Sequence, residues 1–360
     1  MGIYLILIIS FIATYLSIPV IIHIAEKKNL VDVPDFRKVH AVPVAALGGI
    51  GIFGGFALTA LLYIPFSKAP ELQFIMAAAL VILFLGMKDD ILVLSPFKKF
   101  LGQLLAALLV AWKGNLQLTN LQGILGFFQI PPLAGLLLTV LVMVFIINAF
   151  NLIDGVDGLA GSLGLGASVI LGYFFLKNGH YAYAALAFGL SGSILGFLFF
   201  NLHPARIFMG DTGSLLIGLV CSVLVVKFIE TAPGSKAFPS PVSAAAGFSI
   251  LLVPVLDTLR VFILRLAHKR SPFYPDKNHV HHILLSKGLN HNQITALLVS
   301  VNIPVVFFTY AAEALGSAWL MALLAGFYFL LIKLFQLLPG KQAMEKRTRK
   351  SNNILTHPSV

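Results

Sequence analysis

Charged residues are scarce in this sequence of 360 residues. Asp, Glu, Lys and Arg make up 11% of the chain, against roughly 25% in an average soluble domain. So few charges cannot cover a water-soluble surface, and 58% of the residues are hydrophobic. The single cysteine, Cys221, excludes an intrachain disulfide and gives no indication of redox chemistry. The composition therefore predicts a polytopic membrane protein.

Eleven apolar segments can be assigned as membrane spans. A spanning helix needs about 20 mostly apolar residues, or fewer where it packs against neighbours. The segments lie near 3–23, 45–65, 72–87, 99–113, 133–150, 158–177, 181–200, 213–230, 244–265, 293–312 and 317–337. We therefore expect an all-α protein with about eleven transmembrane helices and with its termini on opposite sides of the membrane.

Positive charge is distributed unevenly between the two alternating sets of connecting segments. One set carries 18 Lys and Arg residues in and beside its loops, whereas the opposite set carries five. The richer set comprises 24–44, 88–98, 151–157, 201–212, 266–292 and the tail from 338. Because cytoplasmic loops are enriched in Lys and Arg, the N-terminus is predicted to be outside and the C-terminus cytoplasmic.

Two segments outside the spans have patterns of their own. In 114–132, polar and apolar residues alternate around Gly123, which predicts a small external hairpin on the membrane. The tail 338–360 is polar and basic, and we expect a disordered cytoplasmic extension that faces anionic membrane lipids. Residues 1–337 would then form a single transmembrane domain.

The first unusual polar cluster is Lys88-Asp89-Asp90, at the inner end of the third span. Ionisable residues near a membrane are costly, so their positions are informative. Adjacent carboxylates can hold Mg²⁺ together with substrate phosphates, or can supply a base or a nucleophile. A solvated helix end is the alternative interpretation.

The second cluster is the segment NAFNLIDGVDG. Asn148, Asn151, Asp154 and Asp157 recur every three residues, so a continuous helix would place them along one face. A helix end capped by Asp could explain one of them. Four polar residues within ten favour a functional role.

The third cluster, NLHPARIFMGDTGS, contains an aspartate between two glycines. Asp211 could reach a metal ion, and Phe208 could stack on a nucleotide base. Capping of the next span by Asp211, Thr212 or Ser214 is an equally good interpretation.

The fourth cluster is a basic loop that contains SPFYPDKNHVHH. A zinc site is disfavoured, because H-x-H-H lacks the i, i+4 spacing of a helical zinc pair and no cysteine is nearby. Clustered histidines in a basic loop fit a pyrophosphate better, as donors to its oxygens. Phosphate contact therefore ranks above metal binding, and a His-rich loop without function ranks third.

In this order, the four clusters resemble the polyprenyl-phosphate N-acetylhexosamine-1-phosphate transferase family, of the glycosyltransferase family 4 type. The resemblance runs from DVPDFRKVHAVPVAALGG to the histidine loop. It implies an eleven-span bundle in the bacterial inner membrane with a cytoplasmic-face site. It also implies dependence on Mg²⁺, with Mn²⁺ as an alternative, and two substrates, a UDP-N-acetylhexosamine and undecaprenyl phosphate. No nucleic-acid partner is expected, and a homodimer is left open.

The resemblance also implies roles for individual residues. Asp89, Asp90 and Asp154 would be catalytic, and Asp211 and Asn151 would bind the metal. The substrate-binding residues would be Lys38, Asp157, Asn201, Phe208, Arg265, Asp276, His279, His281 and His282. The active-site loops would be 24–44, 88–98, 148–157, 201–214 and 265–292.

The histidine loop also indicates the sugar donor. The branch of the family that uses UDP-MurNAc-pentapeptide usually carries three consecutive histidines followed by an acidic residue, whereas this chain reads PDKNHVHHILLSKG. The sequence therefore favours UDP-GlcNAc, with undecaprenyl-diphospho-GlcNAc and UMP as products, at the start of a cell-envelope polysaccharide. The MurNAc-pentapeptide transferase is the alternative. A secondary transporter is a more distant one, because transporters place ionisable residues at the midplane of the membrane.

Overall fold

The computed structural model describes residues 2–32, 44–65, 67, 69–271 and 276–340. The α-helices of this part of the chain are α1 (Gly2–Lys27), α2 (Gly48–Tyr63), α3 (Leu72–Leu92), α4 (Pro96–Leu108), α5 (Pro132–Ile153), α6 (Leu159–Lys177), α7 (Tyr181–Asn201), α8 (Gly210–Thr231), α9 (Ser243–Ile250), α10 (Leu252–Ala267), α11 (Val280–Ser286), α12 (His291–Ala311) and α13 (Ser317–Leu337). A short antiparallel pair, β1 (Val31–Asp32) and β2 (Val44–Ala45), follows α1. Single turns of other helix types lie at Leu109–Lys113, Ile124–Gly126, Ala232–Gly234 and Glu313–Leu315.

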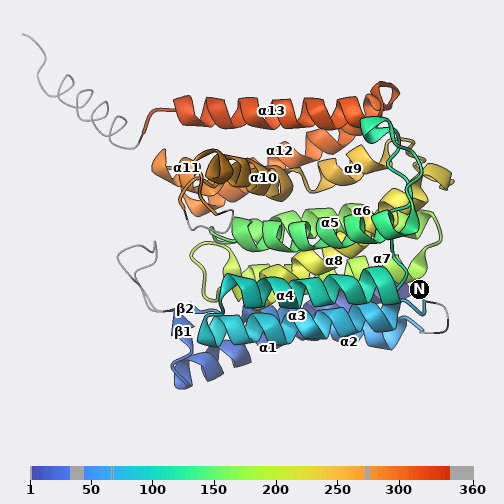
Figure 1. Ribbon diagram of the computed structural model, residues 1–360. Helices are drawn as coiled ribbons and strands as arrows, with labels where there is room; N and C mark the ends of the chain where they lie inside the picture. The colour runs from blue at the N-terminus through green and yellow to red at the C-terminus, as the bar shows by residue number, and fades with distance from the viewer. Residues whose placement is uncertain (1, 33–43, 66, 68, 272–275, 341–360) are drawn as a thin grey trace, which may run out of the picture.

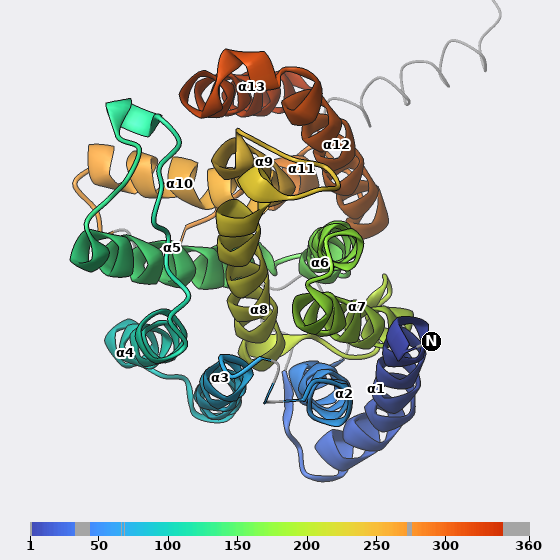
Figure 2. The same ribbon diagram turned by 90° about the vertical axis from the view of Figure 1, so that its right-hand side faces the viewer.

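The long helices lie side by side as a bundle, and their connections collect at its two ends (Figure 1). Helix α1 begins at one end of the bundle and α13 finishes at the other. Helix α8 runs through the middle, with α2, α3, α5, α6, α7 and α9 around it (Figure 2). Its sequence is apolar on every face, which is typical of a helix buried on all sides.

Every apolar segment assigned from the sequence contains a helix. The segment 244–265 differs from expectation, because α9 and α10 meet there at a bend of 85°. By length and apolarity, seven helices of the described chain can cross a membrane, or eight if the bent pair is one span. A multi-pass helical protein is therefore confirmed, whereas the count of eleven and the sidedness of the termini stay predictions.

The hairpin expected in 114–132 forms. Asn120 and Gln129 make an antiparallel bridge, and Gly123 occupies the left-handed region with φ of +80°. The hydroxyl of Thr119 donates to Glu230 at the end of α8 with a distance of 2.6 Å, which ties the hairpin to the bundle. The predictions for Lys38 and for the tail beyond residue 340 lie outside the described residues.

Two glycines bring α2 and α3 against the start of α8. A Cβ atom on Gly49 would lie 2.1 Å from the backbone nitrogen of Gly213, and one on Gly86 would lie 2.4 Å from the Cα of Thr212. Small residues let helix backbones approach closely in membrane proteins. These contacts place the end of α3, which carries the paired aspartates, directly beside the first turn of α8.

Replacement of Gly49 by alanine is expected to destabilise the protein by about 1–3 kcal/mol, because the added methyl group would overpack the α2–α8 contact. Gly54→Ala in the same helix is the matched control, since nothing lies within 4 Å of a Cβ there. Thermal unfolding should show a lower midpoint for Gly49→Ala alone. Equal midpoints for the two variants would contradict the close contact.

Candidate active site

Three polar side chains from three helices surround the ammonium group of Lys99, in the first turn of α4. Lys99 Nζ lies 3.1 Å from Asp89 Oδ2 and 3.0 Å from Asn151 Oδ1, and it also contacts Asp211 Oδ2. Asn151 Nδ2 in turn donates to Asp211 Oδ1 with a distance of 2.7 Å. The structure thus brings together Asp89, Asn151 and Asp211 as predicted, around a lysine that the sequence reasoning missed.

A signal for Lys99 was present in the sequence of α4. Lys99 and Gln103 are four residues apart, so they lie on the same face of the helix. Gln103 is completely buried and exchanges hydrogen bonds with the amide of Asn148, at 2.5 and 3.3 Å. A lysine and a glutamine at this spacing in an otherwise apolar span indicate a face that points toward polar partners.

Asp90 binds the N-terminus of α8. Its carboxylate accepts hydrogen bonds from the backbone nitrogens of Asp211 (2.6 Å) and Thr212 (3.1 Å), and from the Thr212 hydroxyl (2.6 Å). The first nitrogens of a helix lack partners within it, and a carboxylate there is stabilised by the helix dipole. Capping of α8 by its own Asp211 is therefore wrong, because an aspartate from α3 performs this role and Asp211 faces Lys99.

Asp154, directly after α5, lies among other acids. Burial raises the pKa of its half-buried carboxyl group to about 8, and the nearby carboxylates of Asp211, Asp90 and Asp157 act in the same direction. Without a compensating cation, Asp154 is therefore protonated near neutral pH. Such a group is suited to exchange a proton at physiological pH.

The raised pKa of Asp154 predicts how its stability contribution depends on pH. Between about pH 4 and pH 8 the unfolded carboxyl group ionises while the folded one keeps its proton, so this group lowers the stability of the fold as pH rises. Asp154→Asn should therefore have a higher thermal midpoint than the wild type near pH 8, and a similar one near pH 4. Thermal unfolding in EDTA tests this, and a difference that is the same at both pH values would contradict it.

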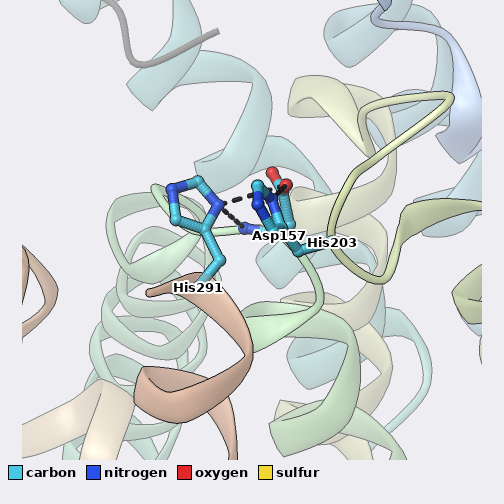
Figure 3. A group of neighbouring side chains, drawn as sticks. All are labelled: Asp157, His203 and His291. Atoms are coloured by element: carbon cyan, nitrogen blue, oxygen red, sulfur yellow. Dashed lines mark hydrogen bonds and ion pairs between the residues drawn. The ribbon is translucent and has the colours of Figure 1, made fainter. Parts of the chain in front are cut away.

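Asp157 is buried and faces two histidines from distant segments (Figure 3). Its Oδ2 atom lies 2.7 Å from His203 Nδ1 and 3.1 Å from His291 Nδ1. The side chain of Asn201 accepts a hydrogen bond from the backbone nitrogen of Gly158 with a distance of 2.9 Å. Asp157 and Asn201 thus belong to one neighbourhood, as predicted, whereas the two histidines were missed.

Phe208 lies in the segment that leads into α8. Its ring is half-buried, and its backbone nitrogen donates to the carbonyl of Ala45 in β2 with a distance of 2.7 Å. The backbone nitrogen of Gly48 donates to the Phe208 carbonyl at 3.0 Å. The backbone of Ala45 and Gly48 therefore holds Phe208 in place.

The histidine loop is organised by a buried aspartate of α10. Asp257 has no solvent exposure. Its carboxylate accepts hydrogen bonds from Arg260 Nη2 at 2.8 Å and from the backbone nitrogen of Val280 at 3.0 Å, and its Oδ2 lies 2.8 Å from His279 Nδ1. Asp257 therefore pairs with Arg260 on its own helix and also fixes the ring of His279.

Arg265 is the next link in this network. It is buried, and its Nε donates to Asp276 Oδ2 with a distance of 2.7 Å. Its Nη2 lies 3.5 Å from His279 Nε2. The guanidinium group lowers the pKa of the Asp276 carboxyl group, although burial acts in the opposite direction. Arg265, Asp276 and His279, which the sequence assigned to the same loop and to substrate binding, therefore lie in one hydrogen-bonded network.

His281 joins the histidine loop to the acidic loop after α5. A Cβ atom on Gly155 would lie 2.3 Å from His281 Nε2, so the ring rests directly on that glycine. Burial and the neighbouring His282 lower the pKa of His281 to about 3, which leaves its imidazole neutral. The His282 ring is half-buried and lies 4.3 Å from that of His281. Among the described residues, His279, His281 and His282 do not form a cluster with metal-ligand geometry.

The fold and the site together define a polytopic helical membrane protein with a carboxylate-rich polar site at the ends of its helices. A comparison with family models matches residues 72–229 to glycosyl transferase family 4. Relatives match most of the chain. A Bacillus subtilis (strain 168) protein named "Probable undecaprenyl-phosphate N-acetylglucosaminyl 1-phosphate transferase" is 34% identical over 328 residues, which cover 87% of each chain.

Two further relatives have names that describe the same type of transferase. An Escherichia coli O157:H7 protein named undecaprenyl-phosphate alpha-N-acetylglucosaminyl 1-phosphate transferase is 30% identical over 86% of this chain and 84% of its own. A Mycobacterium leprae (strain TN) protein named decaprenyl-phosphate N-acetylglucosaminephosphotransferase is 32% identical over 84% and 81%. The chain belongs to glycosyl transferase family 4 and is a transferase. The transporter alternative is therefore wrong.

Proposed function

We propose that the protein transfers GlcNAc-1-phosphate from UDP-GlcNAc to undecaprenyl phosphate, or to a similar polyprenyl phosphate, and releases UMP. The names of the relatives support both substrates. The observation that carries the proposal is the convergence of Asp89, Asn151 and Asp211 on Lys99 at the end of a membrane bundle. At that position a lipid phosphate and a water-soluble nucleotide can meet.

The reaction must bring two anions together. An oxygen of the lipid phosphate attacks the β-phosphorus of UDP-GlcNAc, the bond from that phosphorus to the bridging oxygen breaks, and UMP leaves with the bridging oxygen. Phosphoryl transfer needs positioning and charge stabilisation more than covalent chemistry from the protein. The ammonium of Lys99, held between two carboxylates and an amide, supplies fixed positive charge at the reacting phosphates.

The same residues fit a divalent cation. The oxygens of Asp211, Asn151 and Asp89 face one small region, and carboxylate and amide oxygens are the donors that Mg²⁺ accepts in proteins. Mg²⁺, or Mn²⁺ in its place, would be held by Asp211 and Asn151, with Asp89 facing the same space. Bound there, the ion would neutralise charge on the pyrophosphate.

The acidic residues of the site have different proposed roles, some in proton transfer and others in positioning. Asp154, with its raised pKa, is suited to take or return a proton, and Asp89 orients Lys99. Asp90 supports the reaction by holding α8, and with it Asp211, in place. A covalent route, with Asp89 or Asp90 as the nucleophile, is the alternative. Retention of labelled GlcNAc-phosphate on the protein in the absence of lipid would identify that route.

The remaining residues are assigned to the substrates. Arg265 and the histidines of the loop would contact the pyrophosphate, with Asp276 holding Arg265. Asn201 and Phe208 would contact the uridine, and Lys38 in the first inner loop would contact a phosphate. Anionic lipids at the inner membrane surface would be attracted by the basic segments.

UDP-GlcNAc is favoured over UDP-MurNAc-pentapeptide by the sequence of the histidine loop, which reads NHVHH instead of three consecutive histidines followed by an acidic residue. The test supplies purified protein with undecaprenyl phosphate, Mg²⁺ and each UDP-sugar in turn, and follows the release of UMP. We expect a ratio of about 100 in favour of UDP-GlcNAc, which is the discrimination that a binding site usually achieves against a substrate with added groups. A preference for the pentapeptide donor would reverse the assignment.

A further inference from the structure

The break between α9 and α10 takes the usual partner from one backbone carbonyl. In a continuous helix the carbonyl of Ile250 would accept the N–H of the residue four positions later. That residue is Pro254, which has no N–H. The next carbonyl, that of Leu251, accepts the backbone N–H of Val255 with a distance of 3.1 Å. The hydrogen-bond ladder of α10 thus resumes at once, and the Ile250 carbonyl is the group that needs another donor.

A side chain of α12 supplies that donor. Asn302 Nδ2 donates to the Ile250 carbonyl with a distance of 2.9 Å. Both residues are buried, and α12 packs against α9. Inside a bilayer no water can replace a missing partner, so neighbouring helices must satisfy the backbone where a proline interrupts a helix. Asn302 therefore makes the hydrogen bond that Pro254 cannot make.

The other polar atom of the same amide indicates why an asparagine stands there. Asn302 Oδ1 is buried and has no hydrogen-bond partner among the described residues. A buried polar atom without a partner destabilises a fold, so an apolar side chain would suit α12 better if packing were the only requirement. The bond to the Ile250 carbonyl is the contact that offsets this cost.

We propose that Asn302 is a positioning residue for the transferase reaction, which fixes the direction of α10 and, through α10, the place of the histidine loop. This inference rests on the proposed function and adds a residue that lies outside the site. Asp257 follows Pro254 by one turn. Its carboxylate holds the ring of His279 at 2.8 Å and the backbone nitrogen of Val280 at 3.0 Å. A change in the direction of α10 therefore moves the group that holds the loop.

The same helix carries the two arginines of the loop network. Arg260 contacts the carbonyl of Asn278, and Arg265 Nε donates to Asp276 Oδ2 with a distance of 2.7 Å. Packing against α5 supports α10 from the side, whereas the bond from Asn302 fixes its start. Because a misplacement of about 1 Å caused far from the reacting atoms can lower a rate by about 100-fold, the direction of α10 matters for the contacts to the pyrophosphate.

The first measurement follows the histidine loop without any substrate. Spin labels on Ser286→Cys, at the end of α11, and on Ser95→Cys, directly before α4, report the distance between this loop and the bundle. Both positions are exposed, and Cys221→Ala removes the buried native cysteine. We expect one narrow distance distribution in this background and a broader or shifted one after Asn302→Leu. An unchanged distribution would overturn the proposal.

Thr309→Val is the matched control. It also removes a buried polar group from α12, but the Thr309 hydroxyl donates to a carbonyl of its own helix with a distance of 2.8 Å. The control should therefore keep the narrow distribution. A change of equal size in Thr309→Val and Asn302→Leu would show a general effect of α12 and would contradict the specific role of Asn302.

Steady-state kinetics of UMP release then separate positioning from stability. A loss of folded protein lowers the apparent kcat and leaves KM unchanged, whereas a displaced histidine loop weakens the binding of UDP-GlcNAc and raises its KM. We expect KM to rise about tenfold or more in Asn302→Leu and to stay at the wild-type value in Thr309→Val. A wild-type KM in Asn302→Leu would overturn the proposal. If the wild type released no UMP, the proposed function would fail, and the distance measurement would still decide this inference.

A double variant guards against a simple loss of folding. Pro254→Ala restores an N–H that reaches the Ile250 carbonyl only if the helix continues straight through the break. Pro254→Ala/Asn302→Leu should therefore recover the thermal midpoint that Asn302→Leu loses, while the raised KM and the altered distance remain. Recovery of the wild-type KM together with the midpoint would show that Asn302 only stabilises the fold, and would overturn the proposal.

Discussion

Replacement of Asp211 by asparagine is expected to lower the rate of UMP release by about 100- to 1000-fold, the usual effect of removing one preorganised electrostatic group from a reaction site. Asp211 lies at the start of α8, contacts Lys99 and accepts a hydrogen bond from Asn151. Asparagine keeps the shape of the side chain but removes its charge. The rate should fall at saturating concentrations of both substrates.

The matched control is Glu230→Gln, which removes an acid near the other end of the same helix. Glu230 contacts Thr119 of the hairpin, far along α8 from Asp211. The control should keep the wild-type rate, and thermal unfolding should show that both variants are folded. If Asp211→Asn and Glu230→Gln release UMP at the same rate, the site has been placed at the wrong residues.

Replacement of Asp257 by leucine is expected to destabilise the protein by about 3–5 kcal/mol, because it leaves a buried cation without its partner. Arg260 is only 5% exposed, and its Nη2 donates to Asp257. His279 would lose the carboxylate that fixes its ring, so UMP release should fall as well. Denaturant unfolding and the UMP assay measure the two effects separately.

The double variant Asp257→Leu/Arg260→Met separates stability from activity. Buried ion pairs can often be replaced by apolar residues without loss of stability, so the double variant should recover much of the stability that Asp257→Leu loses. Its activity should stay low, since His279 still lacks its partner. Recovery of the wild-type rate would show that Asp257 only neutralises Arg260 and does not position the histidine loop.

The positions of the helices could be predicted because each apolar run has only one favourable arrangement in a bilayer, where backbone groups must be satisfied within the helix. The break between α9 and α10 was missed, although Pro254 marks it. Proline lacks a backbone N–H and is tolerated in the first turn of a helix, which is where the structure places it, at the start of α10. The apolar composition of 244–265 is the same on both sides of the bend, so composition alone predicts a single span.

The acids of the site could be predicted because they are rare and fall at the ends of spans. Their partners could not, since the contacts join residues far apart in the chain. Lys99 and Asp211 are separated by 112 positions, and Asp157 and His291 by 134. Such pairs depend on how the helices pack, and a single sequence does not record that packing. The different contacts of Asp89 and Asp90 could not be predicted for the same reason. Asp89 pairs with Lys99 and Asp90 binds the N-terminus of α8, and both contacts depend on where α8 lies.

The most direct test of the central claim follows one phosphorus atom. Purified protein is supplied with undecaprenyl phosphate, Mg²⁺ and UDP-GlcNAc labelled with ³²P at the β-phosphate, and the lipid and aqueous fractions are then separated. Transfer of GlcNAc-1-phosphate predicts that the label moves into the lipid while unlabelled UMP appears in equal amount. Label that stays in the aqueous fraction as UDP would show transfer of the sugar alone, and would contradict the proposed reaction.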